Sequence, residues 1–308
     1  MVALDAGDTS VYRPKSAHGT EDHPIVGDWI SLEKVNDDHI FREVLDRRNS
    51  IIRKVAGSTT VPQPLAANLD YAFIATAMEL DLNERRLERY IATVRGSGVE
   101  PVVILTKADL HPDPADAVVR ALSVAGDTPV IVTSAVSGRG LAQIGAYIRQ
   151  GMTVALLGSS GVGKSSLLNL LAGEAIQATN EVRFDGRGRH TTTSRRLVPM
   201  AGGGLILDTP GMRELQLWDV ADGLEMAFAD VQAVAASCGF RDCAHDSEPG
   251  CAVKAAVADG SLDPARLESY RKLERELRSL EIRRSKRAQI EERRRHRVQA
   301  RAMRKSHR

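Results

Sequence analysis

The segment Gly158–Ser165 has the residue types and spacing that bind the phosphates of a nucleotide. It reads Gly-Ser-Ser-Gly-Val-Gly-Lys-Ser, and its glycines let backbone N–H groups approach phosphate oxygens. Lys164 supplies positive charge to the β- and γ-phosphates, and the Ser165 hydroxyl is placed to bind Mg²⁺. An apolar segment precedes the loop and a leucine-rich one follows it, which favours a phosphate-binding loop over an ordinary glycine-rich turn. We expect phosphate contacts from Gly158, Ser159, Ser160, Gly161, Val162, Gly163, Lys164, Ser165 and Ser166.

Two short motifs farther along the chain could complete the shell of the magnesium ion. Asp208 begins Asp-Thr-Pro-Gly at the end of an apolar segment, where an Asp can hold this shell and the N–H of Gly211 can sense the γ-phosphate. Three threonines, Thr191–Thr193, lie between the two loops, and we favour Thr192 as the one that completes the shell. Each motif alone is also typical of a turn or a solvated loop, so its position after the phosphate-binding loop decides the assignment.

The segment Thr106–Asp109 indicates which base the nucleotide carries. It reads Thr-Lys-Ala-Asp after an apolar run and resembles the Asn-Lys-x-Asp element of GTPases. The Asp109 carboxylate would accept two hydrogen bonds that guanine donates and adenine cannot, and a buried carboxylate left without partners is costly. Thr106 in place of Asn loses an amide contact, and the aliphatic stem of Lys107 would lie over the base. The motif predicts GTP and GDP as ligands and opposes an ATP-using enzyme.

The order of these motifs differs from that of ordinary GTPases. Ser134 and Ala135 resemble the Ser-Ala-Lys loop whose backbone supports the base, and they precede the phosphate-binding loop, as Thr106–Asp109 does. In ordinary GTPases both base motifs follow it. This order is a circular permutation, which a compact domain tolerates when its original termini lie close together. The segment after Gly211 is therefore joined directly to the part that senses the γ-phosphate.

The group that orients the attacking water is not the usual one. Many GTPases place Gln immediately after the Asp-x-x-Gly motif, whereas this chain has Met212, which offers water no useful hydrogen bond. We expect slow hydrolysis by the protein alone. His190, beside the switch threonines, is our candidate for orienting water, with Arg187 and Arg189 as possible helpers. The alternative is that His190 contacts RNA or solvent.

Three cysteines and one histidine lie together in the spacing of a structural metal site. Three thiolates and an imidazole within fourteen residues suit tetrahedral zinc, and four protein ligands leave no position open for catalysis. The alternative is three reduced structural cysteines. The odd number and the absence of a secretory signal pattern at the N-terminus oppose disulfides. The expected zinc ligands are Cys238, Cys243, His245 and Cys251.

Alternating strands and helices must position the nucleotide motifs. Short apolar segments bounded by polar turns predict buried parallel strands. A helix is expected to start at Asn83, with Leu87, Ile91 and Val94 on one face, and another to follow the phosphate-binding loop. This pattern predicts a doubly wound α/β domain. The expected strands are Tyr71–Thr76, Val102–Thr106, Val130–Thr133, Val154–Leu157 and Leu205–Leu207.

The two ends of the chain have a different character. The N-terminal part, to about Gly57, has short apolar runs typical of a small β-domain, and Thr59–Asn68 resembles a linker. A long helix is expected from Pro264, with apolar residues at helical spacing. Residues 266–308 contain 17 Lys or Arg against 6 Asp or Glu, whereas residues 1–265 contain 25 against 34. A basic tail on an acidic body indicates a polyanionic partner.

The composition fits a globular protein without a membrane span. Apolar residues make up 43% of 308 residues, enough for a core, and no apolar run reaches the length of a membrane-spanning helix. We expect a cytoplasmic monomer that does not bind membranes.

Together these motifs resemble the RsgA (YjeQ) family of ribosome-assembly GTPases. The resemblance rests on the permuted order and on GSSGVGKSSLLN, GRGRHTTT, DTPGMREL and CGFRDCAHDSEPGC, and VGDWI resembles the family's OB-fold domain. It runs from about residue 24 to about residue 280. It implies an OB-fold in residues 1–57, with an N-terminus that is short for the first strand. It also implies a permuted GTPase domain in 65–218 and a zinc-binding domain with a basic C-terminal helix or tail in 219–308.

The same resemblance implies a function. The family acts late in the maturation of the small ribosomal subunit, binds its rRNA, and hydrolyses GTP with stimulation by that subunit. A GTP-gated RNA-binding scaffold, in which hydrolysis is incidental, is the alternative. The two differ in whether hydrolysis is needed to release the partner.

Overall fold

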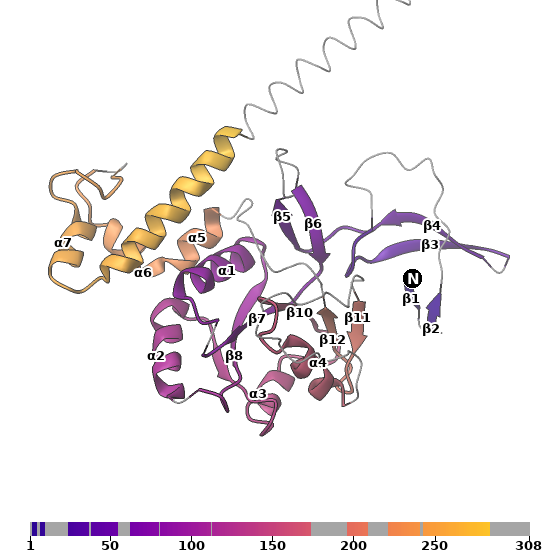
Figure 1. Cartoon of the computed structure of the whole chain (residues 1–308). Coiled ribbons are helices and arrows are strands. Elements are labelled where there is room, and N and C mark those ends of the chain that lie inside the picture. Colours follow the sequence, from indigo (N-terminus) through magenta and orange to yellow (C-terminus); the bar gives the residue numbers. More distant parts are fainter. Residues whose placement is uncertain are drawn as a thin grey trace, which may run out of the picture.

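A six-stranded sheet forms the centre of the molecule (Figure 1). The computed structural model describes residues 2–4, 7–9, 24–36, 38–54, 62–79, 81–111, 113–173, 196–208, 221–240 and 243–283. The strand order is β11-β12-β10-β7-β8-β9, and every neighbouring pair is parallel except β11 with β12. The strands are β7 (Tyr71–Ala77), β8 (Glu100–Thr106), β9 (Val130–Val132), β10 (Thr153–Leu157), β11 (Arg196–Pro199) and β12 (Leu205–Asp208).

The five strands expected from the sequence are confirmed, because both faces of the sheet are buried. Consecutive side chains of a strand point to opposite faces. In β7, Phe73 and Ala75 join the apolar cluster on one face, and Ala72 and Ile74 join the cluster on the other. A strand covered on both sides reads as a nearly continuous apolar run, which is the pattern that the sequence shows.

In the part of the chain that the structure describes, four helices cover the two faces of the sheet. α1 (Glu84–Gly96) and α2 (Pro114–Ala125) pack on one face, and α3 (Leu141–Gly145) and α4 (Lys164–Ala172) pack on the other. The expected N-cap is confirmed, since the Asn83 side chain accepts a hydrogen bond from the Arg86 N–H at 2.9 Å. The expected apolar face of α1 is buried, as are the two leucines at the start of α4.

The N-terminal part consists of antiparallel strand pairs. β1 (Val2–Leu4) pairs with β2 (Gly7–Thr9), β3 (Ile30–Val35) with β4 (Asp38–Val44), and β5 (Ser50–Lys54) with β6 (Pro62–Ala67). The pairs are separate two-stranded sheets within the described ranges.

The linker predicted over Thr59–Asn68 is wrong, because β6 occupies most of it and Leu65, Ala66 and Ala67 are buried. Its prolines suggested a linker, but both stand where a strand tolerates proline. Pro62 is the first residue of β6, and Pro64 faces Ile52 where the register shifts.

The C-terminal part packs on α1 (Figure 1). It contains α5 (Ala221–Ala227), α6 (Ala229–Ala235), α7 (Ala252–Ala258) and a helix over residues 264–283. The helix expected from Pro264 is confirmed, and its apolar face is buried through Leu267, Tyr270, Leu273, Leu277 and Leu280. None of the described helices is long and apolar enough to cross a membrane.

Candidate nucleotide site and metal centre

The structure brings the phosphate and base motifs to one edge of the sheet. β8, β9 and β10 are parallel, so their carboxyl ends lie together, and Thr106–Asp109, Ser134–Ala135 and Gly158–Ser165 follow these ends directly. Ligands of open α/β sheets bind at this edge. Asp208, at the end of β12, is the register partner of Leu156 in β10, which places its backbone at the same edge.

The phosphate-binding loop passes close over the end of β7. Gly158 has φ +135°, and a Cβ at this position would lie 2.2 Å from the Ala75 carbonyl oxygen, so only glycine fits. Gly163, with φ +97°, is the N-cap of α4. The Lys164 ammonium donates to the Gly158 carbonyl at 2.8 Å and also to that of Ser159. Its charge is therefore held over the loop, where phosphate oxygens would lie.

Thr106 links the base motif to the phosphate-binding loop. Its buried hydroxyl lies 2.6 Å from the Val162 carbonyl oxygen and 3.2 Å from that of Thr76. The sequence suggested that threonine here loses an amide contact, but the hydroxyl provides a contact of its own. Two strand ends and the loop are thus tied together by one side chain.

Asp109 is held by the loop that follows β9. The Ser134 hydroxyl donates to Asp109 Oδ1 at 2.5 Å, and it accepts from the N–H groups of Val136 and Ser137 at 3.2 Å each. The sequence predicted support from the backbone of this loop, so the direct side-chain contact was missed. A serine at the end of a strand neighbouring β8 was the available signal.

Asp109 is exposed in this structure. It lies in the turn beyond the end of β8, at the rim of the sheet, and nothing in the described chain covers it. The base itself would have to exclude water there. The aliphatic stem of Lys107 is positioned to help the base exclude water. It lies beside the phosphate-binding loop, since its Cε is 4.0 Å from the position that a Cβ would take at Gly163.

Four potential metal ligands converge in the C-terminal part. Cys238 Sγ and Cys251 Sγ lie 3.6 and 3.5 Å from His245 Nδ1 and 3.9 Å from each other, and all four ligand atoms, with that of Cys243, lie within 4.8 Å. A tetrahedral ion about 2.3 Å from sulfur and about 2.0 Å from nitrogen would give separations of about 3.5 Å (S–N) and about 3.8 Å (S–S). The cluster therefore fits a metal ion.

The electrostatics of the cluster suit a cation. Desolvation, assisted by the neighbouring thiols, raises the pKa of Cys243 to about 11. Desolvation also acts on Cys238, but N–H groups of Val253 and Ala252 at the start of α7 outweigh it, and the pKa of Cys238 is lowered. Desolvation lowers the pKa of His245, which favours the neutral imidazole that binds metals. A dication would stabilise all three thiolates.

Several predicted residues lie outside the described ranges. These are Arg187, Arg189, His190, Thr192, Gly211, Met212 and the basic tail beyond residue 283, and the side chain of Asp208 is likewise not described. Their roles stay predictions.

Comparisons with known proteins agree with this geometry. The family model described as RsgA GTPase matches residues 44–218, and one described as 50S ribosome-binding GTPase matches residues 153–287. A protein of Methanosarcina acetivorans named small ribosomal subunit biogenesis GTPase RsgA is 48% identical, covering 82% of this chain and 70% of the relative. One of Syntrophotalea carbinolica with the same name is 40% identical, covering 96% and 84%.

Two solved structures are similar along most of the chain. YjeQ from Thermotoga maritima has a TM-score of 0.64 and 26% identity, covering 89% of this chain and 92% of that one. YloQ, described as a circularly permuted GTPase, has a TM-score of 0.62 and 28% identity, covering 89% and 88%. The fold and the site define a circularly permuted P-loop GTPase, an enzyme that hydrolyses GTP. The chain belongs to the RsgA GTPase family.

Replacing Thr106 by Val should weaken GTP binding. The change removes the hydroxyl beside the Val162 carbonyl and leaves a buried acceptor unpaired, so we expect affinity to fall about tenfold. Thr133→Val is the matched control, because its buried hydroxyl donates to the Leu105 carbonyl within the sheet. Equal loss of affinity in both variants, measured by titration with a fluorescent GTP analogue, would contradict the specific link.

Replacing Asp109 by Asn should change the base that is bound. An amide can donate to the C2 oxygen of xanthine but cannot accept both guanine hydrogen bonds, so GTP affinity should fall by about two orders of magnitude while xanthosine triphosphate binds better. Asp113→Asn, which keeps an N-cap for α2, is the control. Competition binding of the two nucleotides measures the shift, and unchanged GTP affinity would refute the assignment.

Replacing Cys243 by Ser should damage the C-terminal part and spare nucleotide binding. Metal content should fall and amide exchange in α7 should rise, while GTP affinity stays within about twofold of wild type. Elemental analysis and GTP titration on the same preparation decide the outcome. A large loss of GTP affinity with the nucleotide domain still folded would show that the two sites are not separate.

Proposed function

We propose that this GTPase binds the small ribosomal subunit and acts late in its assembly, hydrolysing GTP to GDP and phosphate with stimulation by the subunit. The observation that carries this proposal is the name small ribosomal subunit biogenesis GTPase, borne by a relative that aligns with 96% of the chain. The guanine site supports it, since the phosphate loop and both base motifs meet at one edge of the sheet. We place this action in the cytoplasm and in a monomer.

Two metals belong to this proposal. Zinc fits the cluster of Cys238, Cys243, His245 and Cys251, where four protein ligands give it a structural role. Mg²⁺ would accompany GTP, held by Ser165 with Asp208 and Thr192. It would neutralise charge on the phosphates, while Lys164 holds a further positive charge over the loop.

The three proposed domains have different roles. Residues 1–57 would form an OB-fold-like domain, which β5 joins to the following segment by pairing with β6. Residues 65–218 would form the GTPase domain, and residues 219–308 the zinc-binding domain with its basic tail. Seventeen basic residues in 266–308 favour binding to rRNA phosphates, with a steep dependence on salt and little sequence preference.

The position after the Asp-x-x-Gly motif explains why a partner would be needed. Met212 replaces the glutamine that commonly orients water, so the isolated enzyme lacks this group. We propose that His190 orients water once the subunit is bound. Gly211 would sense the γ-phosphate from the neighbouring position.

Purified small subunits should raise the GTPase rate of wild type strongly. His190→Ala should lose most of this rise, about a hundredfold for a lost proton-transfer or water-orienting group, while GTP still binds. Met212→Gln should not restore it, because the other contacts of the water are set by a different loop. His111→Ala is the control, since His111 accepts a hydrogen bond from the Asp113 N–H outside these motifs. If the isolated protein already hydrolyses GTP as fast as the subunit-bound protein, the proposal fails. The better explanation is then a GTP-gated RNA-binding scaffold in which hydrolysis is incidental.

A further inference from the structure

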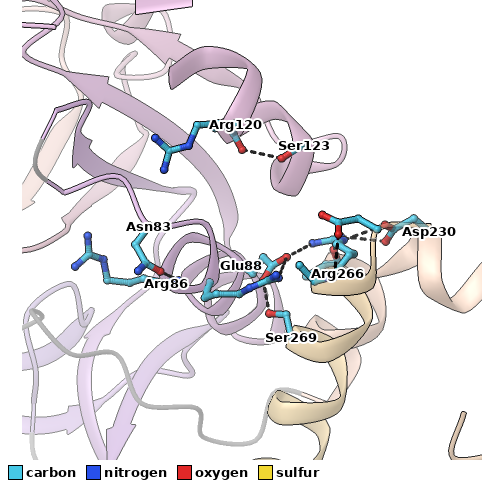
Figure 2. A network of polar contacts seen from close by, with 12 residues as sticks. Asn83, Arg86, Glu88, Arg120, Ser123, Asp230, Arg266 and Ser269 are labelled. Carbon is cyan, nitrogen blue, oxygen red and sulfur yellow. Dashed lines mark hydrogen bonds and ion pairs between the residues drawn. The ribbon is translucent and has the colours of Figure 1, made fainter. Parts of the chain in front are cut away.

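A buried charged network joins α1 to the C-terminal part of the chain (Figure 2). Glu88 of α1 has no exposed surface, and Arg266 and Ser269 of the helix over 264–283 are each 5% exposed. Arg266 Nη1 donates to Glu88 Oε1 at 2.8 Å, and the Ser269 hydroxyl donates to Glu88 Oε2. Glu88 also accepts from Arg85 Nη1 of its own helix, at 3.3 and 3.2 Å, whereas Arg266 and Ser269 reach it from the C-terminal helix.

Arg266 also binds its own part of the chain. Its Nε and Nη2 donate to the two carboxylate oxygens of Asp230 at 2.9 and 3.0 Å, and Nη2 donates to the Ala227 carbonyl at 2.6 Å. Its guanidinium carbon lies 4.2 Å from the centre of the Phe228 ring. The planar fork of arginine has fixed donor directions. Its contacts with Glu88 on one side and with Asp230 and Ala227 on the other are therefore compatible with only one orientation of α1 relative to the C-terminal part.

Such a network is a poor device for stability alone. Desolvation of buried charges offsets most of their attraction, and an apolar contact of the same volume is often as stable. An apolar contact, however, can slide, whereas a fully paired charged group accepts one geometry. The network therefore fixes how the metal-binding part sits on α1.

Two further contacts on α1 point to the same orientation. Arg89 makes two hydrogen bonds of 2.8 Å with the carboxylate of Glu276. A Cβ at Gly223 of α5 would lie 2.1 Å from the Ala92 carbonyl oxygen and 2.4 Å from the Gly96 nitrogen, so the two helix backbones touch. The C-terminal part is thus held at several points along α1.

The same helix is anchored at the nucleotide edge. The Thr76 hydroxyl donates to the Asp81 carbonyl at 3.0 Å, and Asp81 forms an ion pair with Arg86 in the first turn of α1 at 2.7 Å. Thr76 follows Ala75, over which the phosphate-binding loop passes. Contacts are therefore continuous from the phosphate loop through α1 to Arg266.

We propose that Glu88 and Arg266 are positioning residues that fix the metal-binding part on α1, and that subunit-stimulated hydrolysis requires this fixed orientation. The second clause rests on the function proposed above. Neither residue touches the nucleotide site, so both act through the placement of the C-terminal part.

Arg266→Met and Glu88→Gln in the full chain test the proposal. Both should retain metal content, protected amides in α7, and GTP affinity and unstimulated hydrolysis within about twofold of wild type. Amide exchange of α1 and of residues 264–283 should rise, and the subunit-stimulated rate should fall about tenfold. The matched controls are Arg275→Met, an exposed arginine of the same helix bonded to the Arg271 carbonyl, and Glu100→Gln, an exposed glutamate. Both controls should behave as wild type.

A double variant separates orientation from stability. Glu88→Leu with Arg266→Leu leaves no unpaired charge between these two residues, so it should recover part of the thermal stability without recovering the stimulated rate. Recovery of both would overturn the proposal. If amide exchange in Arg266→Met and Glu88→Gln is the same as in wild type, the network does not fix the C-terminal part on α1. If amide exchange rises but the subunit-stimulated rate stays normal, stimulated hydrolysis does not require the fixed orientation. If wild type is not stimulated at all, the proposed function fails, while amide exchange still decides whether the network fixes the contact.

Discussion

The nucleotide site depends on the close approach of the phosphate-binding loop to the end of β7. At Gly158 the loop backbone lies so near the Ala75 carbonyl that a single methyl group would not fit. This contact sets the height of the loop above the sheet. The Thr106 hydroxyl, at the end of the neighbouring strand β8, also holds the loop by its hydrogen bond to the Val162 carbonyl. Because β8 and β9 end at the same edge, Asp109 and Ser134 lie beside each other there and are joined by a hydrogen bond. The guanine and phosphate subsites are therefore parts of one rigid frame, although their motifs lie far apart in the chain.

Sequence reasoning recovered the parts of the fold that follow from local rules. Buried parallel strands, the Asn83 cap and the apolar face over 264–283 each leave a pattern within a dozen residues. The strand β6 was missed because Pro62 and Pro64 are judged by local propensity, whereas their tolerance depends on the register with β5. The hydroxyl of Ser134 as a partner of Asp109 was missed for a similar reason. The hydrogen-bond partner of a side chain at the edge of the sheet depends on how neighbouring strands end there, and no single segment of the sequence encodes that. The metal cluster was accessible because all its ligands lie within one short segment.

α1 contacts both the central sheet and the C-terminal part of the chain. It covers one face of the sheet beside the strand that supports the phosphate loop, and it also contacts α5 and the helix over 264–283. The segment that follows the Asp-Thr-Pro-Gly motif leads directly into α5, which touches the backbone of α1 at Gly223. The part of the chain that would sense the γ-phosphate is thus flanked on both sides by elements packed against the same frame.

The apolar core has a consequence for how the chain can be divided. One continuous cluster contains Ile51 and Leu65 from the N-terminal part, Tyr90 from α1, and Phe228 and Leu267 from the C-terminal part. The boundaries suggested by motifs therefore cut across one continuous apolar cluster. A fragment that ends before α5 would expose the side of α1 against which the α5 backbone packs, and would tend to self-associate through it.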